Sequence, residues 1–106
     1  MNKNKVLGLL GLCARAGKAI SGTDACIEAM KKQKVKLLLV AEDASEKTKK
    51  NMKFYAQKEE IPVCIYGQIE ELSKAIGKQN RAVIGIGEPN FAKEMKKIVD
   101  GGEMIG

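Results

Sequence analysis

The stretch Val35-Lys36-Leu37-Leu38-Leu39-Val40-Ala41 decides the fold class of this protein. Large aliphatic residues follow one another from Leu37 to Val40, without the polar alternation of a strand that has one face in water. Such a run is typical of a strand that is covered on both faces. Glu42 and Asp43 follow it directly and end the strand. We therefore expect a sheet that lies between two layers of helices.

The segments around this strand alternate between helical and extended patterns. The spacing of apolar residues predicts helices over 4–16, 23–33, 44–58, 69–76 and 89–99, and strands over 19–21, 35–41, 63–66 and 81–86. Gly17 and Gly77 stand where helices end, and Pro89 stands where the last helix begins. With 106 residues and 11.5 kDa, the chain has room for one core. The fold class predicted is α/β, with a single domain over residues 1–106.

The composition excludes several kinds of chemistry. Hydrophobic residues make up 44% and charged residues 30%, which is typical of a folded globular protein. The absence of histidine excludes an imidazole base, a Ser-His or Cys-His nucleophile and a histidine metal ligand. Cys13, Cys26 and Cys64 form no CxxC motif, and a closed zinc site would need a fourth ligand. We expect reduced, buried thiols in a cytoplasmic protein, with no catalytic activity, metal or cofactor.

The charge distribution points to an anionic partner. The net charge is +6, and residues 1–53 hold twelve Lys and Arg against five Asp and Glu. This asymmetry predicts one basic face, although lysines that only keep the surface solvated would give the same count. Aromatic residues are few and scattered, which favours a duplex or folded RNA over a single strand as partner. No segment reaches the length of a membrane span, so we expect no membrane partner.

One turn carries the strongest local signal for anion binding. Ser21-Gly22-Thr23-Asp24 leads from a short strand into a helix, with Lys18 just upstream. The first N–H groups of a helix attract anions, and a glycine lets a ligand approach closely. The alternative interpretation is a capping box, with Ser21 as N-cap and Asp24 at the third helical position.

Two groups of lysines have two interpretations each. They are Lys31, Lys32, Lys34 and Lys36 near the end of the second helix, and Lys47, Lys49, Lys50, Lys53 and Lys58 along the third. Each group can be a solvated surface or a stripe that contacts a polyanion.

Three segments together resemble one protein family. They are Gly17-Lys18 with Gly22-Thr23-Asp24, then residues 36–44 (KLLLVAEDA), then residues 72–78 (LSKAIGK). In this order and spacing they resemble the kink-turn RNA-binding ribosomal proteins, a family with an archaeal "L-seven-Ae" type and bacterial YlxQ and YbxF relatives. The resemblance covers roughly residues 5–100. It implies a three-layer α/β/α sandwich with a four-stranded mixed sheet, and a monomer that binds ribosomal or other kink-turn RNA and associates with the ribosome.

The resemblance also implies which residues bind RNA. Gly22, Thr23 and Asp24 match the family's turn at the start of the second helix, where Asp24 would read guanine edges. The late loop Gly77–Arg81 would cover the RNA bulge. The implied RNA-binding set is Lys18, Ser21, Gly22, Thr23, Asp24, Glu28, Lys32, Lys78 and Arg81. Glu28 and Ala25 depart from the family, which usually has Lys and a Glu or Gln at these positions. The alternative is a protein-interaction module on the same fold, with weak, non-specific RNA binding and the apolar first helix as its contact.

Overall fold

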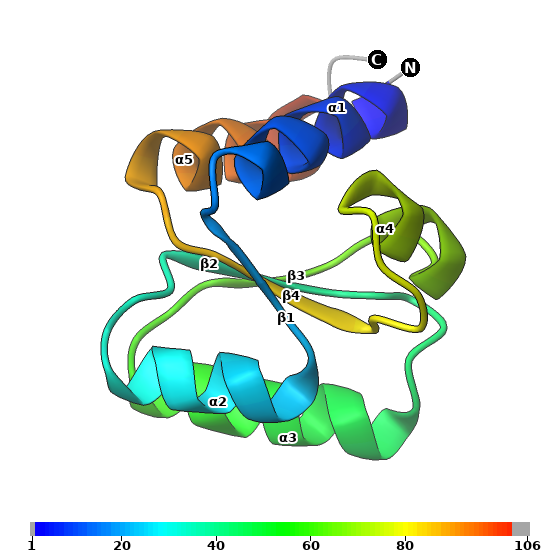
Figure 1. The fold of residues 1–106 in the computed structure, drawn as a ribbon. Coiled ribbons are helices and arrows are strands. Elements are labelled where there is room, and N and C mark those ends of the chain that lie inside the picture. The colour runs from blue at the N-terminus through cyan, green and yellow to red at the C-terminus, as the bar shows by residue number, and fades with distance from the viewer. Residues whose placement is uncertain (1, 103–106) are drawn as a thin grey trace.

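The computed structural model describes residues 2–102 (Figure 1). Helices and strands alternate along the chain, and a short π-helical turn, η1, follows the last helix. The elements are α1 (Asn2–Arg15), β1 (Ala19–Ser21), α2 (Thr23–Lys31), β2 (Leu37–Val40), α3 (Glu46–Lys58), β3 (Val63–Ile65), α4 (Ile69–Ala75), β4 (Val83–Ile86), α5 (Pro89–Lys97) and η1 (Ile98–Gly102). This order confirms the predicted alternation. Residues 1 and 103–106, which the single-domain prediction includes, lie outside the described residues.

The four strands form one mixed sheet in the order β1-β4-β2-β3. β2 pairs in parallel with β3, with Leu39 opposite Cys64. β4 pairs antiparallel with both β1 and β2, and Ile84 stands opposite Leu39 and Ser21. The last strand of the chain therefore lies between the first and second strands.

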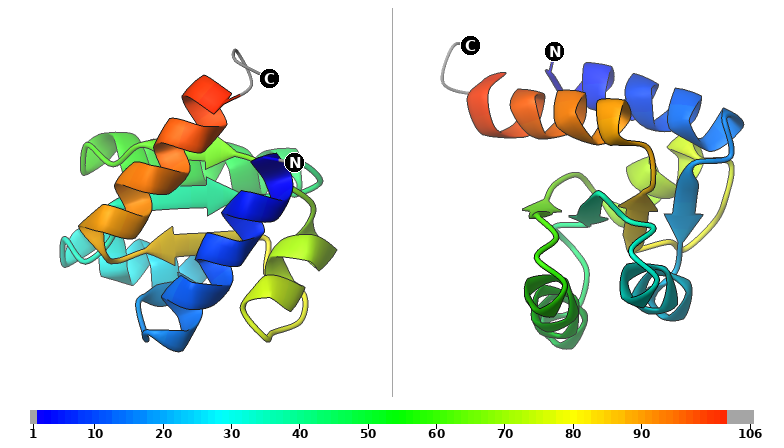
Figure 2. Two further views of the ribbon diagram at one scale, coloured as in Figure 1. Left: turned by 90° about the horizontal axis from the view of Figure 1, so that it is seen from above. Right: turned by 90° about the vertical axis from the view of Figure 1, so that its left-hand side faces the viewer.

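Helices cover both faces of this sheet, as the α/β/α sandwich requires (Figures 1 and 2). α1, α4 and α5 lie on one face, and α2 and α3 lie side by side on the other. All residues of β2 and β4 are buried, which confirms that the aliphatic run is covered on both faces. Cys13, Cys26 and Cys64 are buried and free, also as expected.

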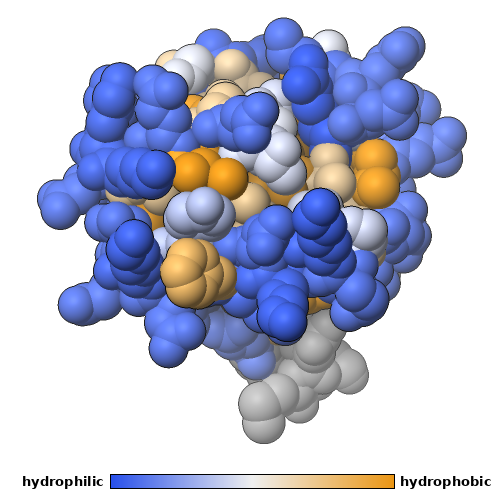
Figure 3. All heavy atoms as spheres, turned by 90° about the horizontal axis from the view of Figure 1, so that it is seen from below, coloured by the Kyte–Doolittle hydropathy of each residue, from blue (hydrophilic) through white to orange (hydrophobic). Residues whose placement is uncertain are grey.

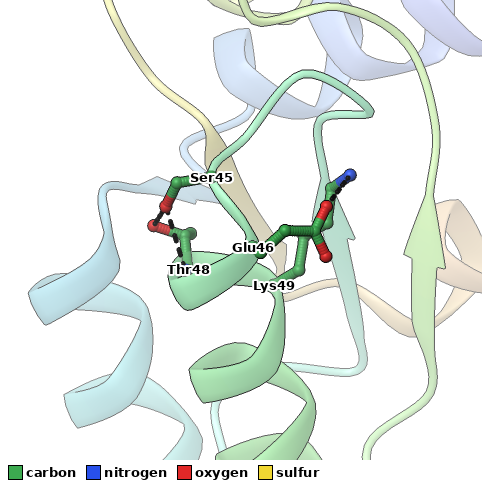
Figure 4. Close-up of polar contacts among 4 residues, drawn as sticks. All are labelled: Ser45, Glu46, Thr48 and Lys49. Carbon is green, nitrogen blue, oxygen red and sulfur yellow. Dashed lines mark hydrogen bonds and ion pairs between the residues drawn. The ribbon is translucent and has the colours of Figure 1, made fainter.

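Some predicted boundaries differ from the structure by one to two residues, for identifiable reasons. Ser45 is the N-cap of α3, because its side chain accepts a hydrogen bond from the Thr48 N–H at 3.1 Å (Figure 4). α3 therefore begins at Glu46 and not at Ala44. β4 begins at Val83 and not at Arg81, because the backbone N–H and C=O of Arg81 bind the Ser73 side chain.

Candidate nucleic-acid interface

The turn into α2 is built around Gly22. This residue has φ 100° and ψ 149°, a conformation that residues with a side chain rarely adopt. Its N–H donates to the Val83 carbonyl at 2.9 Å, which fixes the turn to the start of β4. Its carbonyl accepts from the Cys26 N–H at 3.0 Å and begins the helix.

The capping-box interpretation of this turn is wrong. Gly22, not Ser21, is the N-cap, and no side chain caps the helix. Asp24 lies at the second helical position, is exposed, and has no side-chain partner among residues 2–102. Ser21 and Thr23 flank Gly22 and are partly exposed. The start of α2 thus combines uncapped N–H groups with a carboxylate that is free to accept hydrogen bonds.

Arg81 approaches this turn from the far end of the chain. A Cβ atom at Gly22 would lie 3.5 Å from Arg81 Nη1, so the guanidinium lies close to the Gly22 backbone. Arg81 Nε is buried and has no hydrogen-bond partner in the described part of the chain. The structure therefore brings together a glycine and an arginine that are 59 positions apart in the sequence.

Ser73 holds Arg81 in this position. Its hydroxyl accepts a hydrogen bond from the Arg81 N–H at 2.7 Å and donates to the Arg81 carbonyl at 3.3 Å. Ser73 is 3% exposed and is a buried residue of α4. It is not among the residues that the sequence predicts for the site. It lies within the segment 72–78 that carries the family resemblance, but a single serine in a helix gives no signal of a distant partner.

The late loop lies beside a groove. Gly77 and Asn80 have positive φ values of 72° and 55°, and the Lys78 N–H donates to the Ser73 carbonyl at 2.8 Å. The groove measures about 640 Å³ and opens between α4 and the β2–α3 turn. Its lining residues are Asp43, Ile69, Glu70, Ser73, Lys74, Lys78, Gln79 and Asn80. Lys78, a predicted site residue, thus lines this groove.

Glu28 and Lys32 form an ion pair on α2. Lys32 Nζ lies 3.1 Å from Glu28 Oε1, and both side chains are well exposed. The two residues follow Asp24 at intervals of four, so they share a face with it along about 12 Å of helix. The acidic residue that departs from the family is therefore partly neutralised by a neighbouring lysine.

Lys18 lies apart from the Gly22–Arg81 contact. It precedes β1, whereas Gly22 follows it, and a strand rises about 3.3 Å per residue. Its backbone C=O accepts from the Gly87 N–H at 2.8 Å, at the opposite end of the β1–β4 pair from Val83. The structure therefore separates Lys18 from Gly22 by roughly 13 Å along the strand.

The buried thiols have the electrostatics of core residues. Burial raises the pKa of Cys13 to about 11 and that of Cys26 to about 12, from an ordinary 9.0, and it also raises the pKa of Cys64. Such thiols stay protonated and are poor nucleophiles. Within residues 2–102, no group of three or more Cys, Asp or Glu could hold a metal ion. No helix in the same range has the length and apolar character needed to span a bilayer.

Comparisons with known proteins agree on one family. The model of the "Ribosomal protein L7Ae/L30e/S12e/Gadd45 family" matches residues 4–96. The "RNA-binding protein YlxQ" of Enterococcus faecium is 39% identical over 100 residues, covering 94% of this chain and 96% of that protein. The protein of the same name from Bacillus subtilis (strain 168) is 34% identical over 95 residues, covering 87% and 92%.

Two solved structures share the fold. A protein of unknown function from Bacillus halodurans C has a TM-score of 0.87 and 34% identity, with 91% of this chain and 97% of that one covered. The Giardia lamblia 15.5kD RNA binding protein has a TM-score of 0.81, with 93% and 88% covered. At 18% identity, this second likeness concerns the fold alone.

Proposed function

This chain belongs to the ribosomal protein L7Ae/L30e/S12e/Gadd45 family, and on that premise we propose that it binds folded, kink-turn-like RNA through the N-terminus of α2. The kink-turn is a bent duplex in which sheared G·A pairs stand beside a short bulge. Both YlxQ relatives are described as RNA-binding proteins, and neither name denotes an enzyme. This agrees with the prediction that the chain has no catalytic activity.

The contact between Arg81 and the Gly22 turn carries this proposal. It brings a guanidinium beside the uncapped start of α2, whose second residue, Asp24, has an exposed carboxylate with no partner among residues 2–102. The guanidinium and the N–H groups suit phosphate oxygens, while the carboxylate suits the N–H edge of a guanine.

The other predicted residues take supporting roles. Lys78 would contact RNA from the late loop, where the groove beside α4 leaves room for the bulge. Ser21 and Thr23 would line the turn, and Lys32 would contact a phosphate along α2 once its pairing with Glu28 is relaxed. Lys18 would meet a more distant phosphate. In this proposal residues 1–106 act as one RNA-binding domain in a cytoplasmic, ribosome-associated monomer that needs no cofactor.

The test compares two RNA hairpins, one with a kink-turn and one without its G·A pairs. Wild-type protein should prefer the kinked hairpin, and its affinity should fall steeply between about 50 and 200 mM salt, by roughly 10³ if six phosphates are contacted. Asp24→Ala should weaken the kinked hairpin more than the control hairpin. Glu94→Ala, which removes an exposed carboxylate from α5 on the opposite face, should leave both affinities unchanged. Equal binding of the two hairpins by wild-type protein would contradict kink-turn recognition.

The alternative function, a protein-interaction module, would use the first helix. In the structure Val6, Leu10 and Cys13 of α1 are fully buried, and Leu12 is its exposed large hydrophobic residue at 48%. The apolar face of α1 is therefore largely occupied by packing inside the molecule. An apolar contact at Leu12 would respond little to salt, which separates it from RNA binding.

A further inference from the structure

The outward face of α3 carries an unusual combination of side chains. Lys47, Lys50, Phe54 and Lys58 recur at intervals of three and four, and all are exposed. On the opposite side of the helix, Met52 and Ala56 are buried against the sheet. We call the four exposed residues the α3 stripe. It spans eleven residue steps, or about 16 Å.

Phe54 is the most exposed large hydrophobic side chain of the described residues. It is 59% exposed, and its ring meets Tyr55 edge to face, with 5.3 Å between ring centroids and 79° between planes. Lys58 Nζ lies 6.0 Å from the ring centroid. Lys58 lies over one face of the ring, and the side chain is still more than half exposed, so a planar group can reach Phe54 from solvent.

The lysines of the stripe are free of acidic partners. α3 contains five lysines and one glutamate, and that glutamate, Glu46, pairs with Lys49 at 3.5 Å, away from the stripe (Figure 4). Lys47 and Lys50 form no ion pair within residues 2–102. Figure 3 shows this helical layer from outside, with hydrophobic atoms visible between hydrophilic flanks.

We propose that the α3 stripe is a second RNA-binding surface, which takes a single-stranded segment with a base stacked on Phe54 and phosphates on the lysines. Each nucleotide of RNA carries a negatively charged phosphate and a base that can stack. The lysines of the stripe can bind the phosphates, and Phe54 can stack on a base. At about 3.4 Å per stacked nucleotide, 16 Å corresponds to about five nucleotides. An acidic peptide would satisfy the lysines but would leave the ring of Phe54 in water.

The position of α3 connects the two surfaces. α2, which begins directly after Gly22, packs side by side with α3, and both helices begin at their right-hand ends in Figure 1. A strand that leaves an RNA bound at the start of α2 can therefore continue along α3. This continuity rests on the function proposed above, whereas binding of a single strand to the stripe does not.

In the sequence the aromatic residues are few and scattered, which argues against a stacking surface. In the structure one of the four aromatic side chains, Phe54, lies in the middle of a lysine-rich helical face. Its exposure follows from its helical phase, because it lies four positions from both Lys50 and Lys58.

The direct test uses Phe54→Trp, which introduces the chain's one tryptophan and keeps an aromatic ring at this position. Binding of a twelve-nucleotide oligoadenylate should quench the indole fluorescence, and an abasic oligomer of equal charge should quench it far less. A parallel titration compares a kink-turn hairpin with and without a single-stranded adenosine tail. The tail should raise the affinity of the hairpin, and Phe54→Ala should reduce this gain by on the order of tenfold. Phe54→Ala should not change the affinity for the tail-free hairpin.

Matched variants identify the surface. Leu12→Ala removes the other exposed large hydrophobic residue of the described part of the chain, which lies on the opposite face. It should change neither the affinity for the tailed hairpin nor that for the tail-free hairpin. The double variant Lys47→Gln, Lys50→Gln should weaken the tail contact and lower its salt dependence, whereas Lys93→Gln, Lys97→Gln on α5 should do neither.

The outcomes separate this inference from the function proposed above. The α3 stripe is not an RNA surface if the tail-free hairpin binds, Phe54→Ala leaves the affinity for the tailed hairpin unchanged, and the oligoadenylate does not quench the indole fluorescence. If polyglutamate displaces the oligoadenylate equally well without quenching the indole, the stripe binds acidic peptides and the proposal is overturned. If the kinked hairpin fails to bind while the oligoadenylate quenches the indole and depends on Phe54, the stripe stands and kink-turn recognition does not.

Discussion

Gly22 is required by the backbone of the turn. Its φ of 100° and ψ of 149° turn the chain from β1 into α2, and a residue with a side chain would be strained by that conformation. A Cβ atom there would lie 3.5 Å from Arg81 Nη1, an ordinary van der Waals distance, so the arginine does not itself exclude a larger residue. The turn therefore depends on this glycine, and the turn places its backbone beside Arg81.

Gly22→Ala should destabilise the protein by about 1–3 kcal/mol, because alanine is strained in this conformation. It should also weaken kink-turn RNA binding, because relief of this strain would shift the first N–H groups of α2 relative to Arg81. Urea unfolding and RNA titration measure the two effects.

The control for Gly22→Ala is Gly8→Ala in α1, where an added Cβ has no atom within 4 Å. Alanine is the better helix former by about 1 kcal/mol, so this variant should be more stable than wild type. A Gly22→Ala protein with wild-type stability would contradict the strain assigned to the turn.

Ser73→Ala should loosen the late loop. The substitution leaves the partly buried Arg81 N–H without its 2.7 Å acceptor, which costs about 1 kcal/mol. We expect faster amide exchange at Arg81 and weaker binding of the kinked hairpin. Ser45→Ala, which removes the cap of α3, should cost about 1 kcal/mol and leave hairpin binding unchanged. Equal hairpin affinities for Ser73→Ala and wild type would show that Arg81 does not need this support.

At the scale of a helix, the ion pair between Glu28 and Lys32 would set how much positive charge an RNA bound at α2 meets. Glu28→Gln should release Lys32 and raise the affinity for the kinked hairpin severalfold, and Glu28→Lys should raise it further and steepen the salt dependence. Stability should change little, because exposed pairs of this kind contribute little.

The matched control for Glu28→Gln is Asp100→Asn, which releases Lys96 from a pair of the same spacing on the opposite face. RNA affinity should not respond to it. If both substitutions raise the affinity equally, net charge is responsible and α2 has no special role.

The sequence patterns predicted the helices and strands more accurately than they predicted which residues contact one another. The aliphatic run at Leu37–Val40 and the helical periods around it determine the alternating order, because burial on both faces leaves a local pattern. The capping of α2 could not be predicted, since Ser21 and Asp24 have the spacing of a capping box and only the backbone of Gly22 shows that they do not form one. The approach of Arg81 to Gly22 depends on the pairing of β4 with β1, which no local pattern encodes.

Across the whole molecule, the core keeps its three thiols protonated. Cys26 has a pKa of about 12 in the folded chain, against an ordinary 9.0, because burial disfavours the thiolate. Its Sγ donates a hydrogen bond to the Ile20 carbonyl at 3.3 Å, and only the protonated thiol can make this bond.

Stability should therefore fall in alkaline solution. Above pH 9 the unfolded chain loses the Cys26 proton while the folded chain retains it until about pH 12. The contribution of Cys26 to the free energy of unfolding is complete below pH 9. It is lost as the pH rises towards 12, at up to about 1.4 kcal/mol per pH unit. Urea unfolding from pH 8 to 10.5 measures the slope. Cys26→Ala should show a shallower slope than wild type, and identical slopes would contradict the assignment.

The insertion of β4 between β1 and β2 has a consequence for protein synthesis. The N-terminal segment emerges first from the ribosome, but β1 has no partner strand until Val83–Ile86 have been made. The turn at Gly22 likewise lacks both its hydrogen-bond acceptor, the carbonyl of Val83, and its neighbour Arg81 until that moment. A nascent chain therefore has no assembled Gly22–Arg81 surface until Val83–Ile86 have been translated, and shorter nascent chains cannot compete for its ligand.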